Sequence, residues 1–156
     1  MFERTSTVRF TCGIVAVLFA AAPVGSRAAG IKETTRLTIT GPGVAKPIVV
    51  TDERVLTLSN VYSGTFIGEP VSEPPDNDTP RFAITFDVQS AQGIKASAYT
   101  VTFVKSRWTS EAFVYIPGPR DDSYRRNIST ILRTGVDGQW HHASEQWAQA
   151  ISARLP

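Results

Sequence analysis

Three successive segments of alternating apolar and polar residues constrain the fold of this chain most strongly. They span residues 81–88, 98–103 and 113–116. Successive side chains of a β-strand point to opposite faces of its sheet, so this alternation predicts three strands with one buried face. The connections, around Gly93 and residues 107–110, are short, and short connections favour antiparallel neighbours. The segments therefore predict an antiparallel meander.

The chain before the meander predicts two further short strands and a helical turn. Residues 36–40 alternate as a half-buried strand does, and residues 48–50 form a short β-branched run. Residues 51–52 then offer side-chain oxygens that can begin a helix over residues 53–58, although so short a segment leaves a strand possible. Residues 69–80 are rich in proline and acidic side chains, which predicts an extended, solvated loop.

Two helices are predicted after the meander. Residues 121–123 supply cap oxygens, apolar residues recur at helical spacing over residues 124–132, and Gly135 follows as a stop. Ser144 precedes the second helix. Its apolar stripe consists of Trp147, Ile151 and Leu155. The predicted fold class is α+β, an antiparallel sheet (meander) with two C-terminal helices packed on one face.

Residues 1–28 predict a secretory signal peptide. Two arginines precede the apolar run 12–22, and Ser26 and Ala28 place small residues at the positions that a signal peptidase reads. An uncleaved membrane anchor is the rival interpretation, but this run falls well short of the ~20 residues that a membrane-spanning helix needs. We therefore expect cleavage after Ala28, one domain over residues 29–156, a periplasmic or secreted location and no stable membrane insertion.

Loss of the signal peptide changes the charge and the cysteine content. The whole chain has 16 Lys and Arg residues and 14 Asp and Glu residues, and removing Arg4, Arg9, Arg27 and Glu3 leaves 13 of each. Without a net positive charge we expect no nucleic-acid partner, because such binding rests on a cationic surface. Cys12, the single cysteine, leaves with the signal, so no disulfide or thiolate ligand is expected afterwards.

Two blocks of the sequence resemble a set of small secreted bacterial proteins of no assigned function. The first block has the pattern ITGPG, PI and TD, at residues 39–43, 47–48 and 51–52. The second has VYIPG, Y, N, TI, G, W, AS and W, at residues 114–118, 124, 127, 130–131, 138, 140, 143–144 and 147. The resemblance implies a bacterial, exported protein and nothing about its activity. The acidic loop and the second histidine depart from the pattern and receive no family role.

Any ligand site is expected between residues 113 and 142, where charged and aromatic residues gather. The candidate ligand-binding residues are Arg120, Arg125, Arg126, Trp140, His141 and His142. Guanidinium groups bind carboxylates and phosphates. However, aspartates lie among these arginines, and local ion pairing is the simpler interpretation. We expect Trp140 and Trp147 to be core residues that attach the last turn and helix to the sheet.

The adjacent histidines, His141 and His142, are the candidates for acid–base or metal chemistry. Adjacent side chains diverge, and a zinc site needs further ligands that the sequence does not supply at a known spacing. We therefore predict an exposed histidine pair in a loop, with no catalytic residue, no metal and no cofactor. The favoured function is a non-catalytic binding or accessory module of the bacterial cell envelope, whose partner is a small ligand or an envelope protein. The alternative is a small hydrolase that uses His141 or His142 with a nearby carboxylate.

Overall fold

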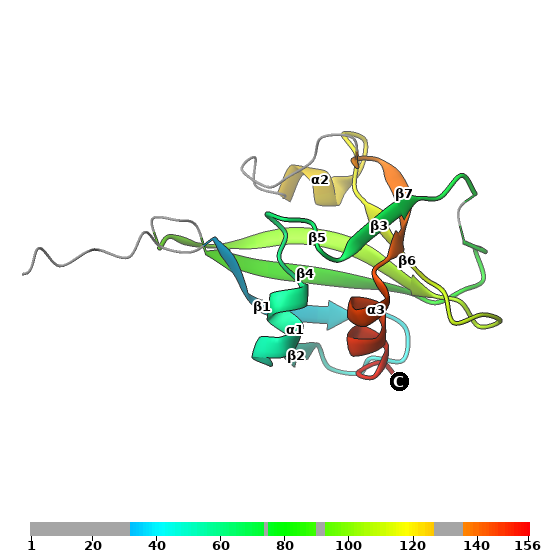
Figure 1. Cartoon of the computed structure of the whole chain (residues 1–156), viewed down its shortest axis with the longest axis horizontal. Coiled ribbons are helices and arrows are strands. Elements are labelled where there is room, and N and C mark those ends of the chain that lie inside the picture. Colours follow the sequence, from blue (N-terminus) through cyan, green and yellow to red (C-terminus); the bar gives the residue numbers. More distant parts are fainter. Residues whose placement is uncertain (1–31, 74, 90–92, 127–135) are drawn as a thin grey trace, which may run out of the picture.

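The fold is built on one seven-stranded antiparallel sheet (Figure 1). The computed structural model describes residues 32–73, 75–89, 93–126 and 136–156, apart from the side chains at 96–98 and 125–126. The strands are β1 (Glu33–Thr40), β2 (Ile48–Val50), β3 (Ile67–Pro70), β4 (Arg81–Gln89), β5 (Lys95–Lys105), β6 (Ala112–Ile116) and β7 (Gln139–Ala143). Their order in the sheet is β2-β1-β4-β5-β6-β7-β3. The predicted α+β class is confirmed.

The predicted meander is confirmed as β4, β5 and β6. Ile84 pairs with Val101, and Phe103 pairs with Val114. Paired residues of antiparallel strands lie on the same face, so the apolar side chains of the three strands form one continuous surface. We call this surface the core face, and the opposite surface the outer face.

Two short helices, α1 (Glu53–Leu58) and α3 (Glu145–Ser152), together with Val61 and Phe66 of the segment after α1, supply side chains that cover the core face. Trp147 of α3 is fully buried, and its ring lies 5.1 Å from that of Phe66 and 5.4 Å from that of Phe103. Its indole N–H donates a hydrogen bond of 2.9 Å to the hydroxyl of Ser59, which in turn donates to the carbonyl of Val55 in α1. This buried chain of hydrogen bonds joins the two helices, so both are fixed on the core face.

The start of α1 follows from its cap residue. Asp52 accepts hydrogen bonds from the backbone N–H groups of Arg54 at 2.9 Å and Val55 at 3.4 Å. These groups have no partner within the helix, so the carboxylate satisfies them and favours helix over strand. The helix predicted for this segment is confirmed. Within the described ranges, no helix is both long and apolar enough to cross a membrane.

The first of the two predicted C-terminal helices is described only at its beginning, as α2 (Asp122–Arg126). The predicted continuation over residues 127–135 lies outside the described residues. In Figure 1, α2 lies away from α1 and α3. Packing of both C-terminal helices on one face is therefore not seen for the part of the first helix that the structure describes.

Two strands were not predicted from the sequence. Residues 139–143 were expected to form a loop that carries exposed histidines, but they form β7 between β6 and β3. Residues 69–70 were assigned to the acidic loop, but they end the edge strand β3. Ile67 pairs with Ala143, and Pro70 pairs with His141. These pairings decide on which face each histidine lies.

Candidate functional site

Four ring side chains lie on the outer face of the sheet, on the neighbouring strands β6 and β7. Val114 and His141 pair with each other on the core face, so the residues beside them in sequence point the other way. The rings of Phe113 and His142 are 5.3 Å apart. The rings of Tyr115 and Trp140 are 5.2 Å apart. All four rings are half-buried.

Tyr115 is held in place by a turn that follows β6. Its hydroxyl donates a hydrogen bond of 2.9 Å to Oδ2 of Asp121, and the backbone N–H of Gly118 donates to the same oxygen at 2.8 Å. A Cβ atom on Gly118 would lie only 2.7 Å from the Cα of Gly138, so glycine lets this turn pack against the turn before β7. Burial, then the hydrogen bond and negative charge of Asp121, raise the pKa of Tyr115. The phenol therefore remains a neutral donor in neutral solution.

A cation lies over the ring of Trp140. The guanidinium of Arg81 is 5.2 Å from the centre of that ring, and it also donates a hydrogen bond of 3.0 Å to the side chain of Asn77. Guanidinium groups are attracted to the negative face of an indole. We call the group of Arg81, Tyr115, Asp121 and Trp140 the Trp140 surface. It offers aromatic rings, a positive charge, a phenol and a carboxylate within a small area.

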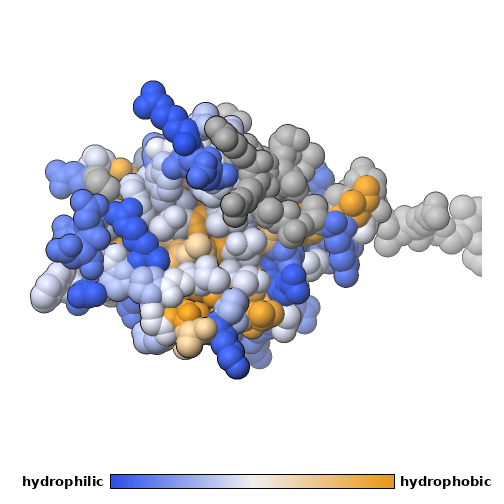
Figure 2. Space-filling model, turned by 180° about the vertical axis from the view of Figure 1, so that it is seen from behind, coloured by the Kyte–Doolittle hydropathy of each residue, from blue (hydrophilic) through white to orange (hydrophobic). Residues whose placement is uncertain are grey.

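Hydroxyl groups extend this surface across the outer face. Thr38 pairs with Thr85, which pairs with Thr100, and the hydroxyls of Thr85 and Thr100 are 3.1 Å apart. Thr102 pairs with Tyr115 of the Trp140 surface. Figure 2 views the side turned away from α1 and α3, with pale and orange residues in its middle and blue residues mainly around its margin. The outer face therefore combines weakly polar hydroxyls with aromatic rings.

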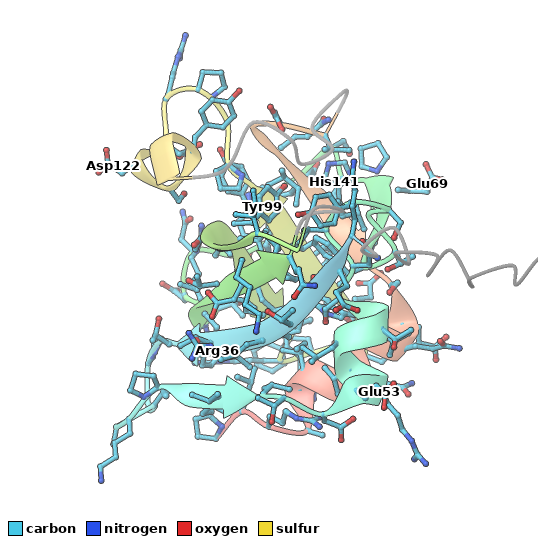
Figure 3. All side chains as sticks on the ribbon, turned by 90° about the vertical axis from the view of Figure 1, so that its left-hand side faces the viewer. Arg36, Glu53, Glu69, Tyr99, Asp122 and His141 are labelled. Atoms are coloured by element: carbon cyan, nitrogen blue, oxygen red, sulfur yellow. The ribbon has the colours of Figure 1, made fainter. Side chains whose placement is uncertain are left out.

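His141 is not in an exposed loop, as the sequence suggested, but is a buried residue of the core face. The residue is 2 % exposed, and its two ring nitrogens lie 3.2 Å from the carbonyl oxygen of Gly68 and 3.3 Å from that of Val136. The ring thus links β3 to the turn before β7. Figure 3 shows His141 within the body of the molecule. In the same view, Asp122 and Glu69 lie at the margins of the molecule.

The remaining predicted site residues are only partly brought together. Trp140 and His142 share the outer face, and Arg120 is exposed in the turn between Tyr115 and α2. Arg125 and Arg126 belong to α2, but their side chains lie outside the described part of the chain. Within that part, the ion pairs closer than 4.0 Å are Arg36–Asp87 and Arg154–Asp52. The expected pairing of Arg120 with a neighbouring aspartate is therefore not seen, because Asp121 accepts from Tyr115 and Gly118 instead.

Arg81 is the residue of the Trp140 surface that the sequence did not indicate. It lies on β4, far from Trp140 in sequence, and the alternation of that strand shows only that it points away from the core. Its place over the indole depends on the path of the chain through three neighbouring strands. No local pattern could have identified it.

Among the residues described, no three His, Cys, Asp or Glu side chains gather closely enough to hold a metal ion. The side chain of His142 forms no hydrogen bond to a carboxylate within the same set of residues. No protein-family model, curated protein or solved structure matches this chain. The arrangement of the outer face is thus the basis for any functional conclusion.

Proposed function

We propose that this chain is an exported, non-catalytic binding module of the bacterial cell envelope, and that it binds its ligand at the Trp140 surface. One observation carries the proposal. Trp140 is a large aromatic residue that contributes nothing to the core face, yet Tyr115 and Arg81 hold it in a defined position on the outer face. Rigid aromatic side chains with a polar neighbour are characteristic anchors of binding surfaces.

The ligand class that fits this surface is a saccharide. A sugar ring presents a face of C–H groups, which stacks on an indole or phenol, and a rim of hydroxyls, which form hydrogen bonds. The Trp140 surface offers rings for the first contact. For the second it offers the guanidinium of Arg81, the carboxylate of Asp121 and the nearby hydroxyl of Thr102.

A binding role is favoured over hydrolysis by the state of the histidines. A general base must reach the proton that it removes from the substrate or its water. The ring nitrogens of His141 face two backbone carbonyls inside the core. His142 packs beside Phe113, without a described hydrogen bond to a carboxylate that could orient it. No observation within the described residues favours the hydrolase alternative.

The cellular part of the proposal rests on the sequence. The signal peptide predicted over residues 1–28 supports export, and the resemblance to small secreted bacterial proteins supports the envelope as the location. A cell-wall polysaccharide is the saccharide that such a protein meets first. Accordingly, we place the protein in the periplasm or outside the cell.

Co-sedimentation with insoluble peptidoglycan tests the proposal. The parent protein is expected to pellet with the polysaccharide, and Trp140→Ala is expected to remain in solution because the stacking contact is lost. Trp108→Ala is the matched control, since Trp108 is 84 % exposed on the loop after β5 and lies outside the Trp140 surface. Equal pelleting of Trp140→Ala and the parent, or no pelleting of the parent, would refute the proposal.

A further inference from the structure

A concave site lies between α3 and the loop that joins β5 to β6. It is a pocket of about 540 Å³, within the range of ~300 to 1,000 Å³ that is typical of small-molecule sites. Its lining includes Lys105, Glu111, His142, Glu145, Gln149 and Ser152. It shares no residue with the Trp140 surface.

Opposite charges line this pocket without pairing with each other. Lys105 forms no ion pair within 4.0 Å and no side-chain hydrogen bond among the described residues, although Glu111 and Glu145 line the same pocket. The carboxylate of Glu111 accepts from the hydroxyl of Thr109, and that of Glu145 accepts from the amide of Gln149, both at 3.1 Å. A carboxylate has about four lone-pair positions, so both retain capacity for a cationic donor.

The charges decide which ligands fit. A simple anion that approached Lys105 would meet the repulsion of two carboxylates, and a simple cation that approached Glu145 would meet the repulsion of the lysine. A molecule that carries both an ammonium and a carboxylate group satisfies both sides of the pocket at once. Charge-assisted hydrogen bonds of this kind are the stronger ones in proteins.

The other lining residues determine the size and polarity of a ligand that fits the pocket. Three alanines, Ala112, Ala143 and Ala148, form an apolar wall with little bulk. Gln149 and Ser152 line the same pocket, and their side chains can bind an amide group. The space therefore suits a small apolar side chain next to a peptide bond.

We propose that this pocket binds a zwitterionic amino acid or short peptide with small apolar side chains. The ligand carboxylate pairs with Lys105, and its ammonium group pairs with Glu145 and Glu111. The small side chain lies against the three alanines. This binding is separate from the recognition of a saccharide and does not depend on it.

Isothermal titration calorimetry of the purified protein with L-alanyl-L-alanine tests whether the pocket binds a zwitterionic peptide. Saturable binding is expected at millimolar or lower concentration. The N-acetylated dipeptide lacks the ammonium group and the C-terminal amide lacks the carboxylate, so each is expected to bind at least about tenfold more weakly, as for the loss of one charge-assisted contact. Absence of binding by the parent dipeptide, or equal binding of the three peptides, would overturn the proposal without requiring any variant.

Two variants place the binding in this pocket. Lys105→Met and Glu145→Gln are each expected to weaken L-alanyl-L-alanine binding at least about tenfold. Lys46→Met and Glu73→Gln change exposed residues outside the pocket and are expected to bind as the parent does. Both pocket variants alter exposed side chains, and a denaturant midpoint close to that of the parent verifies their folding. Parent-like binding by either pocket variant would overturn the assignment of the site.

Discussion

The three tryptophans of this chain lie in three different environments. Trp147 is fully buried, Trp140 is half-buried on the outer face, and Trp108 is 84 % exposed. The expectation that Trp140 and Trp147 both attach the C-terminal segment to the core is correct for Trp147 and wrong for Trp140. The reason lies in β7, where strand alternation gives the inward position to His141 and turns Trp140 outward. Residue type alone could not distinguish these two roles.

The stability of tryptophan variants should separate the two roles. Trp147→Ala removes the ring that contacts Phe66 and Phe103 and leaves the buried Ser59 hydroxyl without its donor. We expect a loss of roughly 3 to 5 kcal/mol in the free energy of unfolding. Trp140→Ala should cost about 1 kcal/mol, the centre of the distribution for point substitutions in general. Denaturant titration measures both. A loss for Trp140→Ala as large as that for Trp147→Ala would make Trp140 a structural residue.

Helices α1 and α3 begin in different ways, although both have a residue with a suitable cap side chain. Asp52 caps α1 through two backbone N–H groups and also lies 3.5 Å from the guanidinium of Arg154. Ser144 precedes α3 in the extended conformation of a cap residue, but its side chain forms no cap hydrogen bond. The expected cap residue of α1 therefore forms its cap hydrogen bonds. That of α3 occupies the cap position without forming one.

This difference predicts unequal effects of the same substitution. Asp52→Ala should lower the free energy of unfolding by about 1 kcal/mol, within the range of ~0.5 to 2 kcal/mol for loss of a helix cap. Ser144→Ala should have a much smaller effect, because no cap contact is lost. Thermal or denaturant unfolding of the two variants measures the contrast. Equal losses would show that Ser144 caps its helix in solution.

The strands that could be predicted are those whose side chains alternate clearly. In β4, every second residue from Phe82 to Val88 faces the core, so the alternation alone is sufficient to predict the strand. In β7, a histidine takes the inward position, and the strand has no apolar alternation. In β3, Gly68 and Pro70 are poor strand formers. Pairing with distant segments decides the structure of β3 and β7, and a local pattern does not contain this information.

Part of the candidate site could also be predicted from the sequence. Trp140, His142 and Arg120 belong to one stretch of sequence, in which polar and aromatic residues are close together in the chain. The stretch did not show that His141 points inward, nor that Arg81 of β4 reaches the indole. Both features depend on how strands from different parts of the chain are aligned.

At the scale of the whole molecule, the proposed export predicts the first residue of the mature protein. If residues 1–28 are a signal peptide, the exported protein begins at Ala29, because Ser26 and Ala28 occupy the positions that signal peptidases read. N-terminal sequencing of periplasmic material from an expressing bacterium measures this. Recovery of the protein with Met1 intact would contradict the assignment and favour a retained anchor.

The strand order implies that this protein completes its fold late in synthesis. The edge strand β3 pairs with β7, which is made much later, and Ser59 receives its hydrogen bond from Trp147, 88 residues further along the chain. Contacts between such distant segments form slowly, because a long loop must close first. The N-terminal half therefore cannot complete its core while it is being synthesised. A chain that stays open until its last strand and helix have been made would remain unfolded long enough for the export proposed above.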